Sequence, residues 1–210
     1  MWLGFIKWMI HSKEWTNYTY ELTDVSQREM TGFFHVITGE DRKKLKEYLN
    51  ECLHDEVLYS HVSRITSGQP FHMGADKNSR PGRRLGWYLA VRLMKPKIVV
   101  ETGVDKGLGS CVIASALIKN GNEGHEGVLH NVDTDSSSGW LIESPYETLV
   151  RSHQTDSLSF LSNFDENIDI IIQDADHSYD YQMAEYMVVF PKMSNGGLII
   201  SDIDNKSSAF

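Results

Sequence analysis

The stretch Glu101-Thr-Gly-Val-Asp-Lys-Gly-Leu-Gly-Ser110 decides the fold of this chain. It begins at the end of a short apolar run, residues 97–102, which is typical of a buried strand, and it leads into an apolar stretch over residues 108–120 that has the length of a helix. Glycines at such a junction allow a tight turn and close approach of the backbone to a ligand, with the amino end of the helix behind it. The stretch therefore predicts a ligand-binding turn after the first strand of a sheet.

Outward from this turn, short apolar runs alternate with helical stretches, which is typical of βαβ units. The predicted strands cover residues 97–102, 127–133, 148–153, 168–174 and 196–202. Helices are predicted over residues 108–120 and 157–163, and a third has one face marked by Tyr179, Met183, Tyr186, Met187 and Phe190. We expect an α/β fold with a Rossmann-like, doubly wound, mostly parallel sheet, whose ligand site lies at the carboxyl ends of the strands.

Residues 1–82 have no strand pattern and predict an N-terminal helical cap segment, followed by the sheet-forming domain over residues 83–210. Ser26 and Glu29 form a capping-box pattern that predicts the start of a helix ending at Gly39. Further helices are predicted over residues 41–52 and 56–65, then a loop over residues 68–82 and a helix that Pro96 closes. We expect this segment to cover the substrate side of the domain.

Composition and charge narrow the classes of function. The chain is 40% hydrophobic and 23% charged, as in ordinary globular proteins, and its net charge is -9. Residues 97–210 contain 6 basic and 18 acidic side chains, which disfavours nucleic-acid binding because that requires neutralised phosphates. The apolar residues 1–10 are too short to span a bilayer and favour a docked helix over a membrane anchor. We therefore expect no nucleic-acid partner and no membrane span.

The two cysteines, Cys52 and Cys111, cannot by themselves form a disulfide framework or a zinc site. A reducing, cytoplasmic compartment fits this usage best. The sequence leaves open whether the chain forms a homo-oligomer.

The acid before the glycine turn bears on the kind of ligand. The glycine spacing is G-x-x-x-G-x-G, whereas dinucleotide sites have G-x-G-x-x-G. A carboxylate at Glu101 would repel a pyrophosphate and attract a cation. S-adenosylmethionine carries both a sulfonium and an ammonium group, so the sequence favours this cofactor over NAD.

Two further strand ends carry polar residues suited to a nucleoside. Asp133 ends the second predicted strand, where a carboxylate accepts hydrogen bonds from ribose hydroxyls in Rossmann-type sites. Asp156 follows the third strand and can accept a hydrogen bond from an adenine amino group, while the backbone N–H of Ser157 can serve a ring nitrogen. Capping of the next helix by Asp156 is an equally good interpretation.

In this order, E-T-G-V-D-K-G-L-G, V-D, T-D-S, Q-D-A-D-H-S-Y and G-G-L-I-I-S-D resemble the motifs of class I S-adenosylmethionine-dependent methyltransferases, over about residues 83–205. The D-x-D-H-S-Y element is similar to the methyltransferase domain 24 group and to metal-assisted small-molecule O-methyltransferases. The resemblance implies that Glu101, Gly103 and Gly107 hold the methionine part, Asp133 the ribose, and Asp156 with Ser157 the adenine. It further implies cofactor contacts at Asp105, Ser110 and Asp174.

The resemblance also implies a metal site. Asp174 and Asp202 follow the fourth and fifth strands, which are neighbours about 4.8 Å apart in the family's strand order. A divalent cation such as Mg²⁺ prefers carboxylate and water oxygens. Metal-assisted relatives have an Asp-Asp or Asp-Asn pair at the second strand end. Here Ile203 interrupts that pair, so Asp204 is the expected third ligand.

His177 and Asp176 are the two candidates for a catalytic base, because both lie at the end of the fourth strand and imidazole titrates near neutral pH. The expected reaction is methyl transfer to a hydroxyl of a small-molecule acceptor. Two alternatives remain: an NAD-dependent oxidoreductase, and a non-catalytic binding protein on a methyltransferase fold. Family members continue past the fifth strand with a helix and a β-hairpin, so we expect those C-terminal strands to be missing from this chain, which stops at Phe210.

Overall fold

The chain divides into two compact units, residues 1–85 and 86–210, of which the computed structural model describes residues 21–67 and 80–202. The helix predicted over residues 1–10, most of the loop predicted over residues 68–82, and the expected metal ligand Asp204 lie outside the described residues. The domain boundary at residue 83 and the capping role of the first unit stay predictions.

Within residues 21–67 of the first unit, three helices follow one another: α2 (Asp24–Thr38), α3 (Arg42–Leu53) and α4 (Glu56–Ser67). The capping box predicted at Ser26 is wrong, because α2 begins earlier and the side chain of Thr23 accepts a hydrogen bond from the Ser26 amide at 3.2 Å. The predicted end at Gly39 is confirmed, since this residue adopts the left-handed conformation that closes helices.

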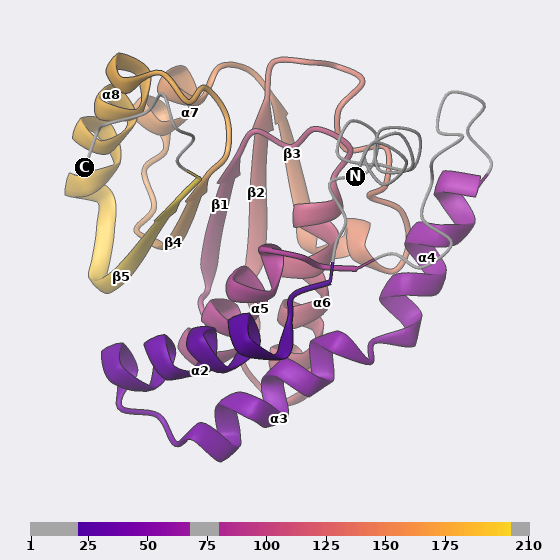
Figure 1. Cartoon of the computed structure of the whole chain (residues 1–210). Helices are drawn as coiled ribbons and strands as arrows, with labels where there is room; N and C mark the ends of the chain where they lie inside the picture. The colour runs from indigo at the N-terminus through magenta and orange to yellow at the C-terminus, as the bar shows by residue number, and fades with distance from the viewer. Residues whose placement is uncertain (1–20, 68–79, 203–210) are drawn as a thin grey trace, which may run out of the picture. The chain divides into compact units, whose positions relative to one another are not determined.

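The second unit contains a five-stranded parallel sheet (Figure 1). Its strands are β1 (Ile98–Thr102), β2 (Val128–Asp133), β3 (Val150–Gln154), β4 (Ile168–Gln173) and β5 (Met193–Ser201). The spatial order is β3-β2-β1-β4-β5, which confirms the predicted doubly wound sheet. The direction of winding reverses between β1 and β4, so a crevice for a ligand is expected at the carboxyl ends of these two strands.

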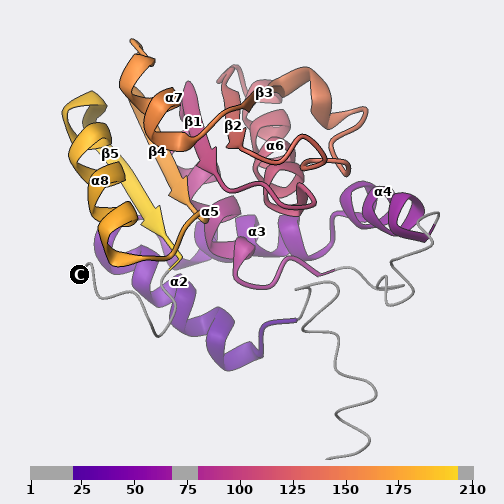
Figure 2. The same ribbon diagram turned by 90° about the horizontal axis from the view of Figure 1, so that it is seen from above.

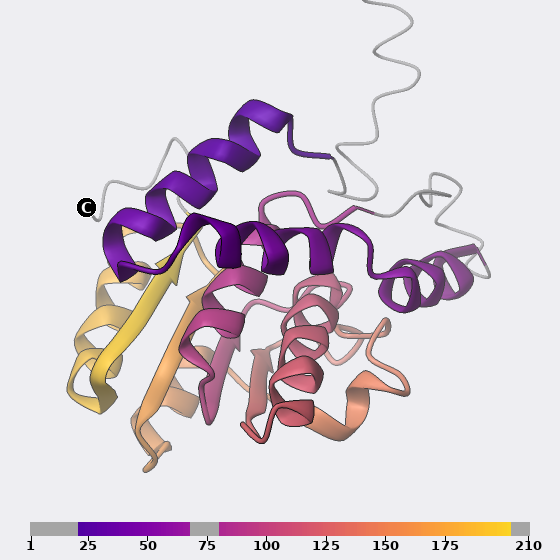
Figure 3. The same cartoon turned by 90° about the horizontal axis from the view of Figure 1, so that it is seen from below.

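Helices cover both faces of this sheet (Figure 2). α7 (Ser157–Asn163) and α8 (Tyr179–Val189) lie on one face, and α6 (Leu108–Asn122) lies on the other. α5 (Arg84–Met94) lies beside α6 (Figure 3), where the Arg92 guanidinium donates a hydrogen bond to the Asn120 side chain. Side chains along a strand alternate between the faces, so Glu101 points towards α6 whereas Thr102 points towards α8.

The starts of two strands differ by more than one residue from those predicted. β3 starts at Val150 rather than at Thr148, because residues 146–149 form the 3₁₀ turn η1 (Tyr146–Leu149). β5 starts at Met193, directly after the 3₁₀ turn η2 (Phe190–Lys192), rather than at Gly196. The carboxyl ends, which carry the predicted site, all lie within one residue of their predicted positions.

The predicted apolar face of α8 is not its buried face. Tyr179, Met187 and Phe190 are 46%, 71% and 74% exposed, whereas the residues of the helix that are buried are Gln182, Glu185 and Val189. The reason is that the neighbouring strand ends carry polar side chains, and α8 supplies their hydrogen-bond partners.

A pair of histidines joins β2 to β3 on the α7 face of the sheet. Nδ1 of His130 lies 3.0 Å from Nε2 of His153, and the rings pack against Phe160 and Phe164. Burial lowers the pKa of both imidazoles from its ordinary value of 6.5, and for His130 the charge of the neighbouring ring adds to this effect. The fold therefore favours the neutral form of this pair.

We expect acid to destabilise the protein through this pair. A lowered pKa means that the stabilisation is complete above about pH 6.5 and is lost as the pH falls below it. The denaturant midpoint of the wild-type protein should fall between about pH 7.5 and pH 5.5, and that of His130→Phe should fall less. His125→Gln, which removes an exposed histidine, is the control and should behave like the wild type. Parallel pH curves for all three proteins would contradict this assignment.

Candidate functional site

The turn after β1 needs glycine at position 103. Gly103 has a φ of 82°, and its amide donates a hydrogen bond of 2.9 Å to the carbonyl of Val132. A Cβ atom at this position would lie 2.2 Å from the backbone oxygen of Asp174. The turn therefore packs tightly between the ends of β2 and β4, and only glycine fits there.

A second loop packs on the turn near Gly107, the residue directly before α6. A Cβ atom on Gly107 would lie 2.9 Å from the side chain of Ile142 and 3.1 Å from the Cα of Gly139. The amide of Gly139 donates to the carbonyl of Asp105 at 2.7 Å, and that of Leu141 donates to Lys106 at 2.9 Å. The loop after β2 thus holds the glycine turn in place, and no side chain caps the amino end of α6.

Glu101 lies beneath the turn. The residue is 1% exposed, and its carboxylate accepts a hydrogen bond of 2.5 Å from the hydroxyl of Ser110. A Cβ atom on Gly109 would lie 2.2 Å from Glu101 Oε1, so the carboxylate packs against the first turn of α6. The structure thus brings Glu101 and Ser110 together as one buried pair, and direct contact with a cation stays a prediction.

Asp133 braces the glycine turn. Its Oδ2 accepts hydrogen bonds from the amides of Val104 and Asp105 at 2.8 and 3.2 Å, and its Oδ1 accepts one from Asp135 at 2.9 Å. A carboxylate has about four lone-pair sites, so one remains for a ligand. Asp105 itself has its side chain exposed and paired with Lys106 at 2.9 Å, so it contributes backbone rather than side chain to the turn.

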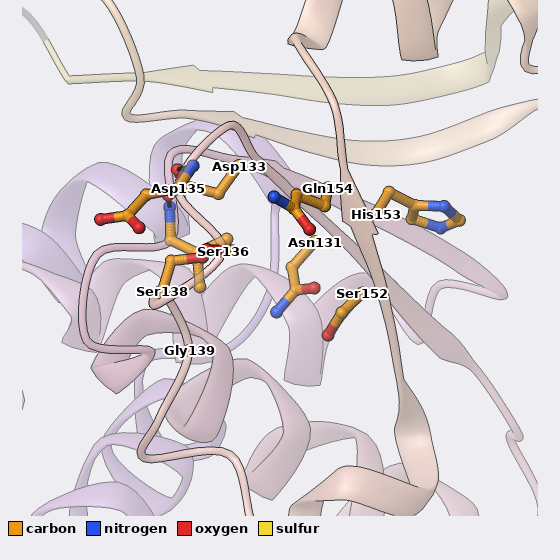
Figure 4. Close-up of a pocket in the computed structure, with 10 residues that line it drawn as sticks. Asn131, Asp133, Asp135, Ser136, Ser138, Gly139, Ser152, His153 and Gln154 are labelled. Carbon is orange, nitrogen blue, oxygen red and sulfur yellow. Dashed lines mark hydrogen bonds between the residues drawn. The ribbon is translucent and has the colours of Figure 1, made fainter.

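A pocket of about 210 Å³ opens beside Asp133, between the ends of β2 and β3 and the loop that follows β2 (Figure 4). The side chains of Asn131 and Ser152, from adjacent strands, point to the same side, and His153 points away from them. Its lining is mostly polar: Val104, Asn131, Asp133, Asp135, Ser136, Ser138, Gly139, Ser152, His153 and Gln154. Such a lining suits the hydroxyl and amino groups of a nucleoside.

Asp156 and Ser157 start α7. Oδ1 of Asp156 accepts a hydrogen bond of 2.9 Å from the amide of Ser159, which is the helix cap that the sequence analysis weighed against adenine binding. Hydrogen bonding to Ser159 also lowers the pKa of the Asp156 carboxyl. The hydroxyl of Ser157 is buried and lies 2.9 Å from that of Tyr181. Cap formation is thus present in the fold, and the adenine contacts stay predictions.

The ends of β4 and β5 bring together three candidate metal ligands. Among the described parts of the chain, Asp174, His177 and Asp202 each offer one ligand atom, and these atoms lie within 4.8 Å of one another. Ligands on opposite sides of an Mg²⁺ ion are about 4.1 Å apart, so small side-chain movements would suffice. Nδ1 of His177 also donates to the backbone oxygen of Asp202 at 3.1 Å. Asp174 and Asp202 of this group fit a divalent cation, and the imidazole of His177 lies beside them.

The surroundings of Asp176 disfavour it as the catalytic base. The residue is exposed, and its Oδ1 accepts a hydrogen bond of 2.7 Å from the amide of Ser178 at the start of α8. Hydrogen bonds from Ser178 and the charge of His177 lower the pKa of the Asp176 carboxyl. A carboxylate with a lowered pKa is a weaker base, so His177 is the better candidate of the two.

Several pocket residues were missed in the sequence analysis. Asn131 and Ser152 are polar residues within β-strands, and Ser136 and Ser138 belong to the serine-rich loop after β2. A polar residue inside an otherwise apolar strand was the available signal for Asn131. For Ser152 and Gln154 the strand register had to be known first, because β3 has no apolar pattern that reveals which side chains face β2.

Removal of the Asp133 carboxylate should weaken cofactor binding. Asp133→Ala leaves three amides of the turn and the following loop without their acceptor, so we expect affinity for S-adenosylmethionine to fall by about 1–3 kcal/mol. Isothermal titration calorimetry measures this loss. Asp165→Ala, which removes an exposed carboxylate after α7, should bind like the wild type. Equal affinities for the two variants would argue against any role of Asp133 in the cofactor site.

Comparison with known proteins agrees with this geometry. Residues 100–202 match the family described as "Methyltransferase domain". No curated protein sequence gives a significant match. Solved structures share the fold at low sequence identity, and the residues matched by the family cover the glycine turn, the pocket and the Asp174–His177–Asp202 group.

Three of these structures illustrate the likeness. SAH-bound methyltransferase PaMTH1 from Podospora anserina is 17% identical, with a TM-score of 0.52 over 76% of this chain and 68% of its own. The O-methyltransferase TomG from Streptomyces achromogenes, solved with SAM, is 18% identical, with a TM-score of 0.52 over 87% and 74%. Cofactor-bound Rv0187 from MTB is 14% identical, with a TM-score of 0.56 over 75% and 70%.

The fold and the family match define a class I methyltransferase domain with a Rossmann-like sheet. Residues 100–202, just under half of the chain, match this methyltransferase domain, and the match together with the shared fold supports an S-adenosylmethionine-dependent methyltransferase.

Proposed function

We propose that this protein transfers a methyl group from S-adenosylmethionine to a hydroxyl of a small-molecule acceptor. The single observation that carries the proposal is the convergence of the glycine turn, the polar pocket and the Asp174–His177–Asp202 group at the carboxyl edge of one parallel sheet. The similarity to TomG, an O-methyltransferase, supports oxygen as the accepting atom.

In this proposal the cofactor lies across the carboxyl edge of the sheet. The polar pocket takes the nucleoside, since about 210 Å³ is less than the roughly 300–1,000 Å³ of pockets for whole ligands. Asp133 accepts a ribose hydroxyl with its remaining lone pair. Glu101 provides a negative charge beneath the turn, and Gly103 and Gly107 let the backbone contact the methionine part. Asp156 and Ser157 lie at the adenine end.

His177 acts as the base. Its Nδ1 donates to the carbonyl of Asp202, which leaves the lone pair on Nε2 free to take a proton. As the acceptor oxygen bonds to the methyl carbon, the carbon–sulfur bond breaks and the hydroxyl proton passes to His177. Much of the acceleration comes from holding the two reactants in line. Asp174 and Asp202 would hold a divalent ion such as Mg²⁺, which would supply charge stabilisation near the acceptor oxygen.

The cysteines and the charge of the second unit bear on the location of the protein and on its acceptor. Among residues 21–67 and 80–202, no helix is long and apolar enough to cross a bilayer. Cys52 and Cys111 are free and buried, and burial raises the pKa of each thiol, to about 12 for Cys52. Buried free thiols accord with a cytoplasmic location, and the acidic second unit disfavours nucleic acid as the acceptor.

Separate titrations with three ligands test the proposal. Calorimetry with S-adenosylmethionine, its demethylated product and NAD should show binding of the first two and none of the third. Transfer of a labelled methyl group to small hydroxylated acceptors then identifies the reaction. Binding of NAD alone would instead favour an oxidoreductase, and cofactor binding with transfer only to amines would overturn the assignment to oxygen.

A further inference from the structure

The inner face of α8 is polar, although it is buried against the sheet. Gln182 and Glu185 are each 1% exposed, and burial of a carboxyl group is rare unless the group has hydrogen-bond partners. Neither residue belongs to the glycine turn, the pocket or the Asp174–His177–Asp202 group. Their partners show what they do.

One chain of hydrogen bonds links Glu185 to the last residues of β4 and β5. Nε2 of Gln173 donates to Oε2 of Glu185 at 3.1 Å, and the hydroxyl of Ser201 donates to Oε1 of Gln173 at 2.7 Å. Tyr186 closes the chain by donating to Ser201 at 2.7 Å. Gln173 directly precedes Asp174, and Ser201 directly precedes Asp202, so the chain crosses between the two strands one residue before the candidate ligands.

A second set of bonds holds the backbone at Asp202 itself. Its carbonyl accepts hydrogen bonds from Nε2 of Gln182 at 3.0 Å and from Nδ1 of His177 at 3.1 Å. Its amide donates to the carbonyl of Gln173 at 2.9 Å. The end of β5 is thus tied both to β4 and to α8, and the same carbonyl orients the imidazole of His177.

The carboxyl of Glu185 also faces a polar atom of β1. Within the described part of the chain, Glu185 Oε1 and Thr102 Oγ1 are both buried without a hydrogen-bond partner. Burial raises the pKa of the Glu185 carboxyl above its ordinary value, although hydrogen bonding opposes the rise. A neutral carboxyl carries one donor and can still accept the bond from Gln173, as a glutamine side chain can.

We propose that Glu185 is a positioning residue, which through Gln173 and Ser201 fixes the ends of β4 and β5 and so sets the spacing of Asp174 and Asp202. The inference rests on the proposed function, because the spacing matters for holding a divalent ion. Glu185 touches neither acceptor nor cofactor in this proposal and acts only through its partners. Outer hydrogen-bond partners of this kind typically change metal affinity by about 10–100-fold when they are removed.

The test compares two variants of the full chain. Glu185→Gln keeps an acceptor for Gln173 and a donor, whereas Glu185→Leu has a similar volume and leaves Nε2 of Gln173 unpaired. Val189→Ala is the control, since Val189 is fully buried on the same helix and belongs to the apolar core cluster. Mn²⁺ binding followed by electron paramagnetic resonance is the first readout, and hydrogen exchange of the Asp174 and Asp202 amides is the second.

We expect Glu185→Leu to bind Mn²⁺ about 10–100-fold more weakly than the wild type and to exchange both strand-end amides faster. Glu185→Gln should restore both properties, and Val189→Ala should lose thermal stability but keep its Mn²⁺ affinity. Wild-type binding and exchange in folded Glu185→Leu would overturn the inference, as would a Glu185→Gln variant as weak as Glu185→Leu.

Mn²⁺ binding by the wild-type protein tests the proposed metal site independently of the role of Glu185. If the wild-type protein itself did not bind Mn²⁺, the metal part of the proposed function would be wrong. The inference would then be decided by hydrogen exchange alone: faster exchange at the two strand ends in Glu185→Leu, restored in Glu185→Gln, supports it, and unchanged exchange overturns it.

Discussion

Replacement of Gly103 by alanine is expected to abolish binding of S-adenosylmethionine and to lower the melting temperature. The new Cβ would lie 2.2 Å from the backbone oxygen of Asp174, a contact that no rotamer change can relieve. The backbone would also have to keep a φ of 82° with a side chain present, which costs about 1–2 kcal/mol. Overpacking adds about 1–3 kcal/mol, so the turn must move away from β4 and lose its shape.

Calorimetry and thermal denaturation separate the two effects of Gly103→Ala. A loss of about 2–5 kcal/mol corresponds to a fall in melting temperature of roughly 4–20 °C for a chain of this size. Gly121→Ala is the matched control, because a Cβ there meets nothing within 4 Å and φ is not positive. A folded Gly103→Ala protein that binds S-adenosylmethionine as tightly as the wild type would show that the turn is not the cofactor cradle.

Removal of the Asp174 charge is expected to have the second-largest effect. Carboxylates on adjacent strand ends repel one another unless a cation or a proton lies between them. With Asp174→Asn one charged ligand becomes neutral, so the Mg²⁺ concentration needed for half-maximal methyl transfer should rise at least about tenfold. Chelation with EDTA should suppress the wild-type reaction, and added Mg²⁺ should restore it.

The control for Asp174→Asn is Asp180→Asn, which removes the same charge from the exposed first turn of α8. It should leave the Mg²⁺ requirement unchanged. Methyl transfer that resisted EDTA and depended only on His177 would mean that the imidazole acts without a metal. In that case His177→Ala would remove the activity, whereas Asp174→Asn would change it little.

The fold was predictable because its determinants are local. β1 and β4 are short apolar runs, and the glycine turn marks the junction of β1 and α6 without ambiguity. α7 agrees with its prediction at both ends, since Asp156 is a strong cap and the helix is short. The capping box at Ser26 failed because Thr23 offers an equally good cap three residues earlier, and local sequence cannot rank the two.

The site was predictable only in outline. Strand-end residues such as Asp174 and Asp202 could be placed together, because parallel strands end at one edge of a sheet. The hydrogen bonds of Asp133 to the turn could not be foreseen, since they depend on the fold of the loop that follows. The polar inner face of α8 could not be predicted from hydrophobic periodicity, which assigns apolar residues to the buried face of a helix. Glu185 is buried because it accepts a hydrogen bond from Gln173, and not because its side chain is apolar.

The place of β1 in the sheet has a consequence for synthesis on the ribosome. All five of its residues are buried, and it pairs with β2 on one side and with β4 on the other. Val99 pairs with Ile170, so one whole edge of this apolar strand has no native partner until β4 has emerged from the exit tunnel. During that interval the nascent chain presents an open strand edge of the kind that associates with other chains. The doubly wound order that creates the crevice thus also defines the period in which the growing polypeptide depends most on protection from aggregation.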